Sequence, residues 1–376
     1  MKLSDVCDVY SGYAFKKFND LGHGVPVIKI SNLLSDGSID LINCLFTTEN
    51  FKEKFYSKKN DIYIALSGAT TGKVGIMDKD DTFVINQRVG IVRNRSTVPN
   101  EYLKYFLMSK SNRILEEASG CAQPNISPKQ IADYDVPIFS DAEMIKIVSE
   151  LREIDKVKSI YQRRLELLDE LVKARFVEMF GDPNIEFKYN SIKFNDLVVR
   201  MTKGPFGSDM KKDLFVPKGE DTYKVYIQIN AIQKNQSLGE YYISKEYFDR
   251  KVSRFELFPN DYIITCDGTL GKYLKLDENM EKGVISPSLL RLTLQSDKIN
   301  DKYFENIWDF YMLGLMKKEA RNACLMHLPS AKKIGEISIP IPPLELQNQF
   351  ASFVQEIDKS RLLSNHSLSL IKSIIF

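Results

Sequence analysis

One internal repeat runs through this sequence, and it constrains the fold more than any other feature. Aligning residues 1–180 with residues 192–376 brings similar stretches together in the same order, at a nearly constant offset. The clearest match pairs NDIYIALSGATTGK at residues 60–73 with NDYIITCDGTLGK at residues 260–272. Because a repeated sequence indicates a repeated structural unit, the chain is expected to contain two copies of one domain.

Each copy begins with a segment of mixed secondary structure. Short runs rich in β-branched and aromatic residues, such as residues 61–66 and 261–266, predict strands that end at glycine-containing turns. Residues 101–119 and 301–320 have apolar side chains at helical spacing. The predicted fold class is therefore α/β, as a tandem pseudo-twofold repeat of two mixed α/β domains.

A long helix follows the mixed segment in each copy. From residue 141 to residue 180, and again after PIPPLELQ at residues 340–347, apolar residues recur every three or four positions, which is typical of a coiled-coil seam. Each seam can pack on its own domain, or the two can pack on each other; their similar lengths favour the second arrangement. The seam positions are Met144, Ile147, Leu151, Ile154, Tyr161, Leu165, Leu168 and Val172, and then Leu346, Phe350, Phe353, Ile357, Leu368, Ile371 and Ile375.

The stretch SGATTGK at residues 67–73 is close to a P-loop but departs from it at two points. A P-loop has four residues between its glycines and a Ser or Thr after its lysine. Here three residues separate Gly68 from Gly72, and Val74 follows Lys73. Because the second copy contains the related DGTLGK at residues 267–272, we interpret both stretches as turns of the repeated domain.

The sequence lacks the residue patterns that enzymes and cofactor sites require. It contains no G-x-S-x-G, G-x-G-x-x-G or [ND]-P-P-[YF] stretch, and no C-x-x-C pair. We interpret Asp267, beside Gly268, as a turn residue and not a catalytic acid. The chain is thus predicted to be non-catalytic, with no metal and no cofactor of its own. The dispersed candidates are Cys7, Cys44, Cys121, Cys266, Cys324, His23, His327 and His366.

Several features favour a reducing cytoplasm as the compartment. The N-terminal MKLSDVCDVY has no apolar run like that of a signal peptide, and no stretch has the length and apolarity of a membrane span. The odd number of scattered cysteines does not indicate a disulfide framework, so the cysteines are expected to be small half-buried hydrophobic residues.

Two similar domains on paired helices form an object that suits duplex DNA, whose equivalent grooves recur with each helical turn. The formal charge is only +2, so any phosphate-binding surface has to come from local groups of Lys and Arg. The copies differ at their turns, for example NQR at residues 86–88 against SPS at residues 286–288. We therefore expect two half-sites of different sequence.

Stretches along nearly the whole chain resemble the specificity subunit of a type I restriction–modification enzyme. One departure is VPIFSDAEMIK at residues 136–146, where the family usually has a PPLEEQ-like helix entry; the first long helix is therefore expected to begin differently. The similar stretches are SGYAF (11–15), SGATTGKVGI (67–76), QPNIS (123–127), LVKARFVEMFGDP (171–183), GPFGSDMK (204–211), HLPSAKKIGEISIPIPPLELQ (327–347) and QEIDK (355–359).

This resemblance implies two target-recognition domains, at residues 1–140 and 191–342, joined by two long antiparallel coiled-coil-like helices at residues 141–190 and 343–376. It implies a double-stranded DNA partner with a split target, two methyltransferase subunits and motor-nuclease subunits, and no membrane. S-adenosylmethionine and ATP would be bound by those partner subunits. The alternative is an assembly scaffold that holds partner subunits without sequence-specific DNA recognition.

Candidate DNA contacts are the polar and basic residues at the predicted turns, because Lys and Arg bind phosphates while Asn, Gln, Ser, Thr and Arg bind base edges. In the first copy they are Lys16, Lys17, Lys29, Ser31, Asn32, Thr70, Thr71, Lys73, Gln87 and Arg88. In the second copy they are Lys203, Ser208, Lys211, Gln228, Asn230, Thr269, Lys272, Ser286 and Ser288.

Overall fold

The computed structural model divides the chain into two units, Met1–Arg164 with Ser364–Phe376, and Leu165–Leu363. Each hydrophobic core lies within one of these units. The structure describes residues 1–20, 22–77, 79–80, 82–118, 124–182, 184–233, 239–322 and 327–375, without the side chains of residues 320–322 and 372–375.

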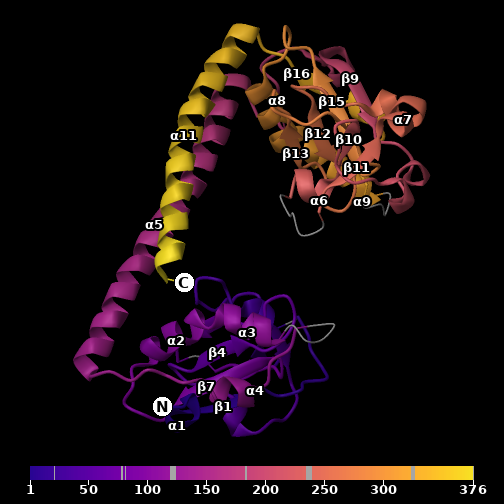
Figure 1. The fold of residues 1–376 in the computed structure, drawn as a ribbon. Coiled ribbons are helices and arrows are strands. Elements are labelled where there is room, and N and C mark those ends of the chain that lie inside the picture. Colours follow the sequence, from indigo (N-terminus) through magenta and orange to yellow (C-terminus); the bar gives the residue numbers. More distant parts are fainter. Residues whose placement is uncertain are drawn as a thin grey trace. The chain divides into compact units, whose positions relative to one another are not determined.

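The first domain contains two small sheets and four short helices (Figure 1). The larger sheet is antiparallel, in the order β1 (Cys7–Ser11), β7 (Val89–Asn94), β4 (Ile62–Ala65) and β5 (Val74–Ile76). The smaller sheet has the order β3 (Leu45–Thr47), β2 (Val25–Ile28) and β6 (Val84–Ile85), with β2 and β6 parallel. The helices are α1 (Leu3–Val6), α2 (Asn100–Ser109), α3 (Ser111–Ala118) and α4 (Pro128–Ala132).

The second domain repeats this arrangement (Figure 1). Its larger sheet has the order β9 (Val198–Lys203), β15 (Leu289–Leu294), β12 (Tyr262–Thr265) and β13 (Tyr273–Lys275). The three-stranded sheet is β11 (Tyr241–Ser244), β10 (Thr222–Tyr226) and β14 (Gly283–Ile285), again with one parallel pair, and β8 (Ser191–Lys193) pairs with β16 (Ser338–Pro340). Its helices are α6 (Gln228–Ala231), α7 (Lys245–Tyr247), α8 (Asp301–Ile307), α9 (Leu313–Asn322) and α10 (Ala331–Gly335).

The repeat predicted from the sequence is therefore confirmed at the level of topology and register. Equivalent residues make equivalent contacts: the Tyr102 hydroxyl donates to the Pro137 carbonyl, and the Tyr303 hydroxyl donates to the Pro340 carbonyl, each at 2.7 Å. Asn60 and Asn260, which lie just before the central strands β4 and β12, both have a φ of 70°. Identical unusual backbone at matched positions indicates one fold used twice.

The central strands form because both of their faces are covered. In β4, Ile62 and Ile64 face a core that includes α2, while Tyr63 faces the core formed with the smaller sheet. Successive side chains of a strand point to opposite faces, so a strand buried on both sides needs a continuous apolar run. The same division recurs in β12, where Ile264 and Ile263 belong to different cores.

The two long helices are α5 (Asp141–Phe180) and α11 (Leu344–Ile375). Inside the second unit they pair antiparallel. The Phe350 ring lies 5.6 Å from that of Phe176, and further along the pair Arg361 binds Asp169 at 2.6 Å. The two seams thus pack on each other, as expected. The alternative also holds in part, because Met144 near the start of α5 lies in the first domain's core.

The long helices begin differently, as predicted. Ser140 and Glu143 form a reciprocal cap at the start of α5, with Ser140 N–H 3.0 Å from the Glu143 carboxylate. The start of α11 follows Pro343 and is anchored by the buried Gln347, which accepts from Asn300 N–H at 2.8 Å. The seam position Ile375 lies outside the described side chains.

The helices predicted at residues 101–119 and 301–320 are each interrupted in the structure. Residues 101–119 were expected as one helix, but α2 ends at Ser109 and α3 starts at Ser111. Residues 301–320 form α8, a π-helical turn at Trp308–Met312, and α9. Both interruptions occur where a side chain binds a hairpin turn, which is a tertiary contact that local spacing does not encode.

Candidate nucleic-acid interface

In the first domain, four stretches that are far apart in the sequence meet beside the larger sheet. The Gly12 N–H donates to the Val89 carbonyl at 3.0 Å, and the Leu66 N–H donates to the Arg88 carbonyl at 2.9 Å. The Ile126 N–H in turn donates to the Leu66 carbonyl at 2.9 Å. These bonds place the end of β1, the turn after β4, the turn before β7 and the segment before α4 next to one another.

Glycine is required where the chain leaves the first strand of each larger sheet. A Cβ added at Gly12 would overlap the backbone carbonyl of Ile85, and a Cβ added at Gly204 would overlap that of Ser286. Backbone atoms cannot move aside as a flexible side chain can. The same close approach is thus built into both domains, and it sets the position of the residues that follow each glycine.

The SGATTGK stretch is a hairpin turn that links β4 to the antiparallel β5. Gly68 and Gly72 have φ values of 84° and 85°, which favour glycine. The Gly72 carbonyl accepts from the Ser111 hydroxyl, and the equivalent Gly271 carbonyl accepts from the Trp308 indole, both at 3.0 Å. A P-loop is followed by a helix, whereas this turn leads into a strand, so the interpretation as a turn is confirmed.

A hollow in the first domain gathers polar side chains from all four stretches. Gln87 and Arg88 are exposed at its edge, and within the described residues neither side chain has a hydrogen bond or ion pair. The Ser67 hydroxyl is buried in the hollow and likewise has no partner in the described part of the chain. The polar lining is Ser11, Ser67, Gln87, Arg88, Asn125 and Ser127.

The second domain places an aspartate and a histidine at the equivalent position. The Cys266 N–H donates to the Ser288 carbonyl at 2.8 Å, and the Leu328 N–H donates to the Cys266 carbonyl at 2.8 Å. This frame holds Asp267 beside His327, with Oδ1 and Nδ1 2.5 Å apart. In the first domain the same bridge joins Ser67 to Asn125, so a serine–asparagine pair in one domain is replaced by an aspartate–histidine pair in the other.

The predicted contact residues fall into three groups by exposure. Exposed are Lys16, Lys17, Ser31, Gln87, Arg88, Lys203, Ser208, Lys211, Thr269 and Lys272. Half-buried are Lys29, Thr70, Lys73, Gln228, Asn230 and Ser288. Buried are Asn32, Thr71 and Ser286.

The three buried residues need correction, because their polar groups are used inside the fold. The Asn32 amide donates to the Asp40 carbonyl at 3.0 Å, and the Thr71 hydroxyl donates to the Gly68 carbonyl at 2.7 Å. Ser286 is only 4% exposed. A side chain that is buried and already bonded cannot reach a DNA base edge without breaking those bonds, so we leave these three out of the proposed interface.

The structure brings only some of the remaining candidates together. Gln87 and Arg88 share the hollow, whereas Thr70 and Lys73 lie on the neighbouring hairpin turn. Lys29 lies with its amine 4.9 Å from the Phe18 ring centroid. The two basic residues that follow Gly12 are anchored through their backbone N–H groups, which both donate to Glu49.

Sequence reasoning missed Ser67, Asn125, His327 and Phe206. The first three sit on segments that are bridged only in the folded chain. Phe206 is 77% exposed beside the glycine that follows β9. The one sequence signal for Phe206 was the pair of glycines around it in GPFGS, because an aromatic residue between glycines at a turn is less readily explained as a core residue.

The other chemical possibilities are limited. Burial raises the pKa of Cys7 to about 12, of Cys44 to about 11 and of Cys266 to about 12, so these three free thiols are protonated, and they are more fully buried than the half-buried positions expected. Cys121 and Cys324 lie outside the described residues.

Among described residues, no three His, Cys, Asp or Glu side chains are grouped to hold a metal, and none of the helices could cross a membrane.

The chain was compared with known proteins. Residues 1–170 and 207–373 match the family described as the type I restriction modification DNA specificity domain. The MjaVIII specificity subunit of a type I restriction enzyme from Methanocaldococcus jannaschii is 27% identical over 46% of this chain, and the match spans 43% of that subunit. The putative MjaX specificity subunit from the same organism is 23% identical over 95% of this chain and 86% of its own length.

A solved structure of a type I restriction–modification system, described as the basis of complex assembly and conformational transition, shares the fold. It covers all of this chain and 94% of the solved chain, with a TM-score of 0.56 and 13% identity. The family match includes most of both domains and parts of both long helices. The chain therefore belongs to the family of type I restriction–modification DNA specificity subunits.

Proposed function

We propose that this chain recognises a split double-stranded DNA target, with one half-site for each domain. One observation carries the proposal: the two domains share a backbone frame but present different side chains at equivalent turns. Arg88 and the pair Ser67–Asn125 occupy the positions held by Ser288 and the pair Asp267–His327. Equivalent frames would approach the two half-sites alike, while different side chains would select different bases.

The proposed contacts divide by chemistry. Phosphates would be bound by exposed lysines, which position the protein without selecting sequence. Base edges would be contacted by Gln87 and Arg88 in the first domain, and by Ser288 and His327 in the second. Arginine can bind the O6 and N7 atoms of guanine with two hydrogen bonds. The proposed phosphate-binding residues are Lys16, Lys17, Lys29, Lys73, Lys203, Lys211 and Lys272.

The long helices would serve as the scaffold. We propose recognition domains at residues 1–140 and 191–342, a helix with its linker at residues 141–190, and a second helix at residues 343–376. Two methyltransferase subunits and the motor-nuclease subunits would assemble on this chain in a reducing cytoplasm. Methylation, cleavage and ATP hydrolysis would belong to those partners, and this chain would be non-catalytic.

Selection of bound duplexes from a random pool tests the proposal directly. The reconstituted complex of this chain with its methyltransferase subunits should select two short conserved blocks separated by a spacer. Replacement of Arg88 by Ala should relax one base position in one block, at a cost of about 1–3 kcal/mol if the side chain contacts a base. The other block should be unchanged.

Arg88→Lys is the matched control, because lysine keeps the charge but loses the planar pair of donors. A phosphate contact would survive in this variant, and a bidentate base contact would not. A complex that binds all sequences equally would support the alternative of an assembly scaffold and would contradict the proposed function. Relaxation in both blocks would remove Arg88 from the recognition residues.

A further inference from the structure

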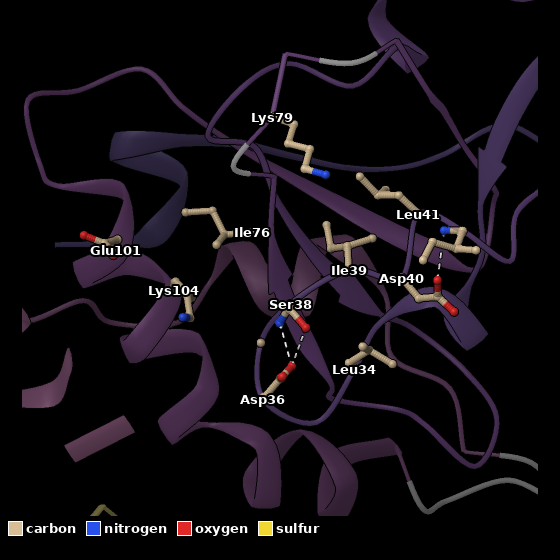
Figure 2. Close-up of a pocket in the computed structure, with 12 residues that line it drawn as sticks. Leu34, Asp36, Ser38, Ile39, Asp40, Leu41, Ile76, Lys79, Glu101 and Lys104 are labelled. Atoms are coloured by element: carbon tan, nitrogen blue, oxygen red, sulfur yellow. Dashed lines mark hydrogen bonds between the residues drawn. The ribbon is translucent and has the colours of Figure 1, made fainter. Parts of the chain in front are cut away.

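A second concave site lies on the first domain, and DNA recognition does not account for it. Figure 2 shows this pocket, which we call the Lys104 pocket. It is enclosed by the loop at residues 34–42, by Ile76 at the end of β5, and by Glu101 and Lys104 on α2, with Lys79 above it.

The acidic side chains around the Lys104 pocket are already engaged. The Asp36 carboxylate accepts from the backbone N–H and hydroxyl of Ser38, at 2.9 and 2.6 Å (Figure 2). Asp40 accepts from the Ile42 N–H at 2.9 Å, as well as from a neighbouring asparagine. Glu101 forms an ion pair with Arg152 of α5. Among the described residues, none of these carboxylates forms a hydrogen bond or an ion pair with Lys104 or Lys79.

The lysine amines, in contrast, are available. Lys104 is only 9% exposed, yet among the described residues it has no hydrogen bond and no ion pair; its amine lies 4.8 Å from the Tyr105 ring centroid. Burial lowers the pKa of Lys104, and the charges of Asp155 and Asp36 offset this only in part. Lys79 is exposed and also has no ion pair within the described part of the chain.

Burying an ammonium group without a partner is costly. In proteins such a group is normally paired or hydrogen-bonded, so a nearly buried lysine that faces a cavity indicates a ligand with negative charge. The cavity is open enough to admit a negatively charged ligand, because Ile42 on its rim is 91% exposed and Leu34 is 40% exposed.

The apolar rim distinguishes between kinds of anionic partner. Protein–DNA interfaces are strongly polar and positively charged, whereas the core of a protein–protein interface is apolar and depleted of charge. Here two available lysines lie among Leu34, Ile39 and Ile42. This composition fits a carboxylate surrounded by apolar side chains better than it fits a phosphate backbone.

The second domain carries a different charge at the position equivalent to Lys104. Tyr102 and Tyr303 are equivalent, so Lys104 corresponds by helical position to Glu305. The Glu305 carboxylate is paired with Lys302 at 3.0 Å and also accepts from the Tyr262 hydroxyl at 3.1 Å. The uncompensated charge is therefore particular to the first domain and not a requirement of the fold.

We propose that the Lys104 pocket docks an aspartate or glutamate side chain of another protein subunit that assembles on this chain. The proposal rests on the proposed function, which supplies such partner subunits. The carboxylate would bind the amines of Lys104 and Lys79, and its apolar neighbours would cover Leu34 and Ile42. The site lies next to α5, to which α2 is tied by the Tyr105 hydroxyl and Asp155 at 2.8 Å.

Replacing Lys104 by Met tests this assignment, because methionine fills a similar volume without the charge. The full chain should unfold at a higher temperature, since a buried charge is removed. Its affinity for the partner subunit should fall by roughly thirtyfold or more, as expected for loss of one member of a buried charge pair. A lysine that merely supports the fold would show the opposite effect on stability.

Binding is measured separately for the methyltransferase subunit, for the motor-nuclease subunit on the assembled methyltransferase, and for DNA. Lys79→Glu should weaken binding of the same protein subunit as Lys104→Met does. Lys59→Glu, on an exposed loop of the same domain, should leave the binding of both protein subunits unchanged. Unchanged affinity at both protein steps would overturn the proposal, and so would a loss confined to DNA, which would assign the pocket to a phosphate. Failure of the unmodified chain to bind either subunit would instead contradict the proposed function.

Discussion

The two recognition domains share their strand order, their glycine contacts and their tyrosine anchors, and they differ where polar side chains meet. In the first domain the bridged pair Ser67–Asn125 lies beside an exposed arginine; in the second, Asp267–His327 lies beside a serine. Each of the contacts that the two domains share involves a backbone group. The variable ones involve side chains at turns, which can change without disturbing a strand.

The difference extends below the surface. Asp61 and Asp261 are buried at equivalent positions, and each accepts a backbone N–H from the preceding turn. Asp61 is held by the two donors of Arg93, at 2.8 and 2.6 Å, whereas Asp261 accepts from the hydroxyl of Thr293. The same backbone arrangement therefore accommodates an arginine partner for the aspartate in one copy and a hydroxyl partner in the other.

The largest expected difference in stability between the two domains arises on replacing this aspartate. Asp61→Asn leaves the half-buried Arg93 without its counter-charge and should cost about 3–5 kcal/mol. Asp261→Asn keeps only one of the two oxygens that accept from the Phe258 N–H and the Thr293 hydroxyl, so it loses one hydrogen bond and should cost about 1–2 kcal/mol. Hydrogen exchange of the full chain, followed separately on β4 and β12, measures both losses. Equal loss of protection in the two domains would contradict the distinction.

A smaller effect should appear at the tyrosine anchors, where the comparison is expected to hold. Tyr102→Phe and Tyr303→Phe each remove a 2.7 Å hydrogen bond to a proline carbonyl. Tyr303 is fully buried and Tyr102 is 5% exposed, so the first variant should cost about 1 kcal/mol and the second up to about 3 kcal/mol. Thermal unfolding of the two variants gives the order, and a larger loss for Tyr102→Phe would reverse it.

The smallest expected effect is on stability at acid pH. It distinguishes the two domains because it acts on the second domain. Burial alone would raise the pKa of Glu281, but hydrogen bonds and charges from Lys218 and Lys224 outweigh it and bring the pKa to about 2. A carboxyl with a lowered pKa stabilises the fold above its unfolded value of about 4.3 and loses this contribution as the pH falls.

Glu281→Gln should therefore flatten the pH dependence of stability between about pH 5 and pH 2. The protection of β10 and β14 against hydrogen exchange at pH 6 and at pH 3 would reveal it, with β2 and β6 of the first domain as the internal control. A variant whose β10 loses as much protection on acidification as the unmodified chain would show that Glu281 does not contribute.

The sequence by itself determined the repeat, the central strands and the two long helices. These features are local: a continuous apolar run specifies a strand buried on both faces, and an apolar residue every three or four positions specifies a helix with one packed side. The positions of Gly68 and Gly72 were sufficient to exclude a P-loop, because spacing along the chain decides that geometry. The antiparallel helix pairing was implied by family resemblance.

Only the tertiary structure decided which polar residues are available to a partner. Asn32 and Thr71 have suitable chemistry for DNA, but distant or neighbouring carbonyls bind them inside the fold. His327 meets Asp267 across sixty positions, and Lys104 becomes nearly buried under a loop from elsewhere in its domain. Exposure and pairing depend on the geometry of each turn and on contacts between segments remote in sequence, and the pattern of residue types along the chain encodes neither.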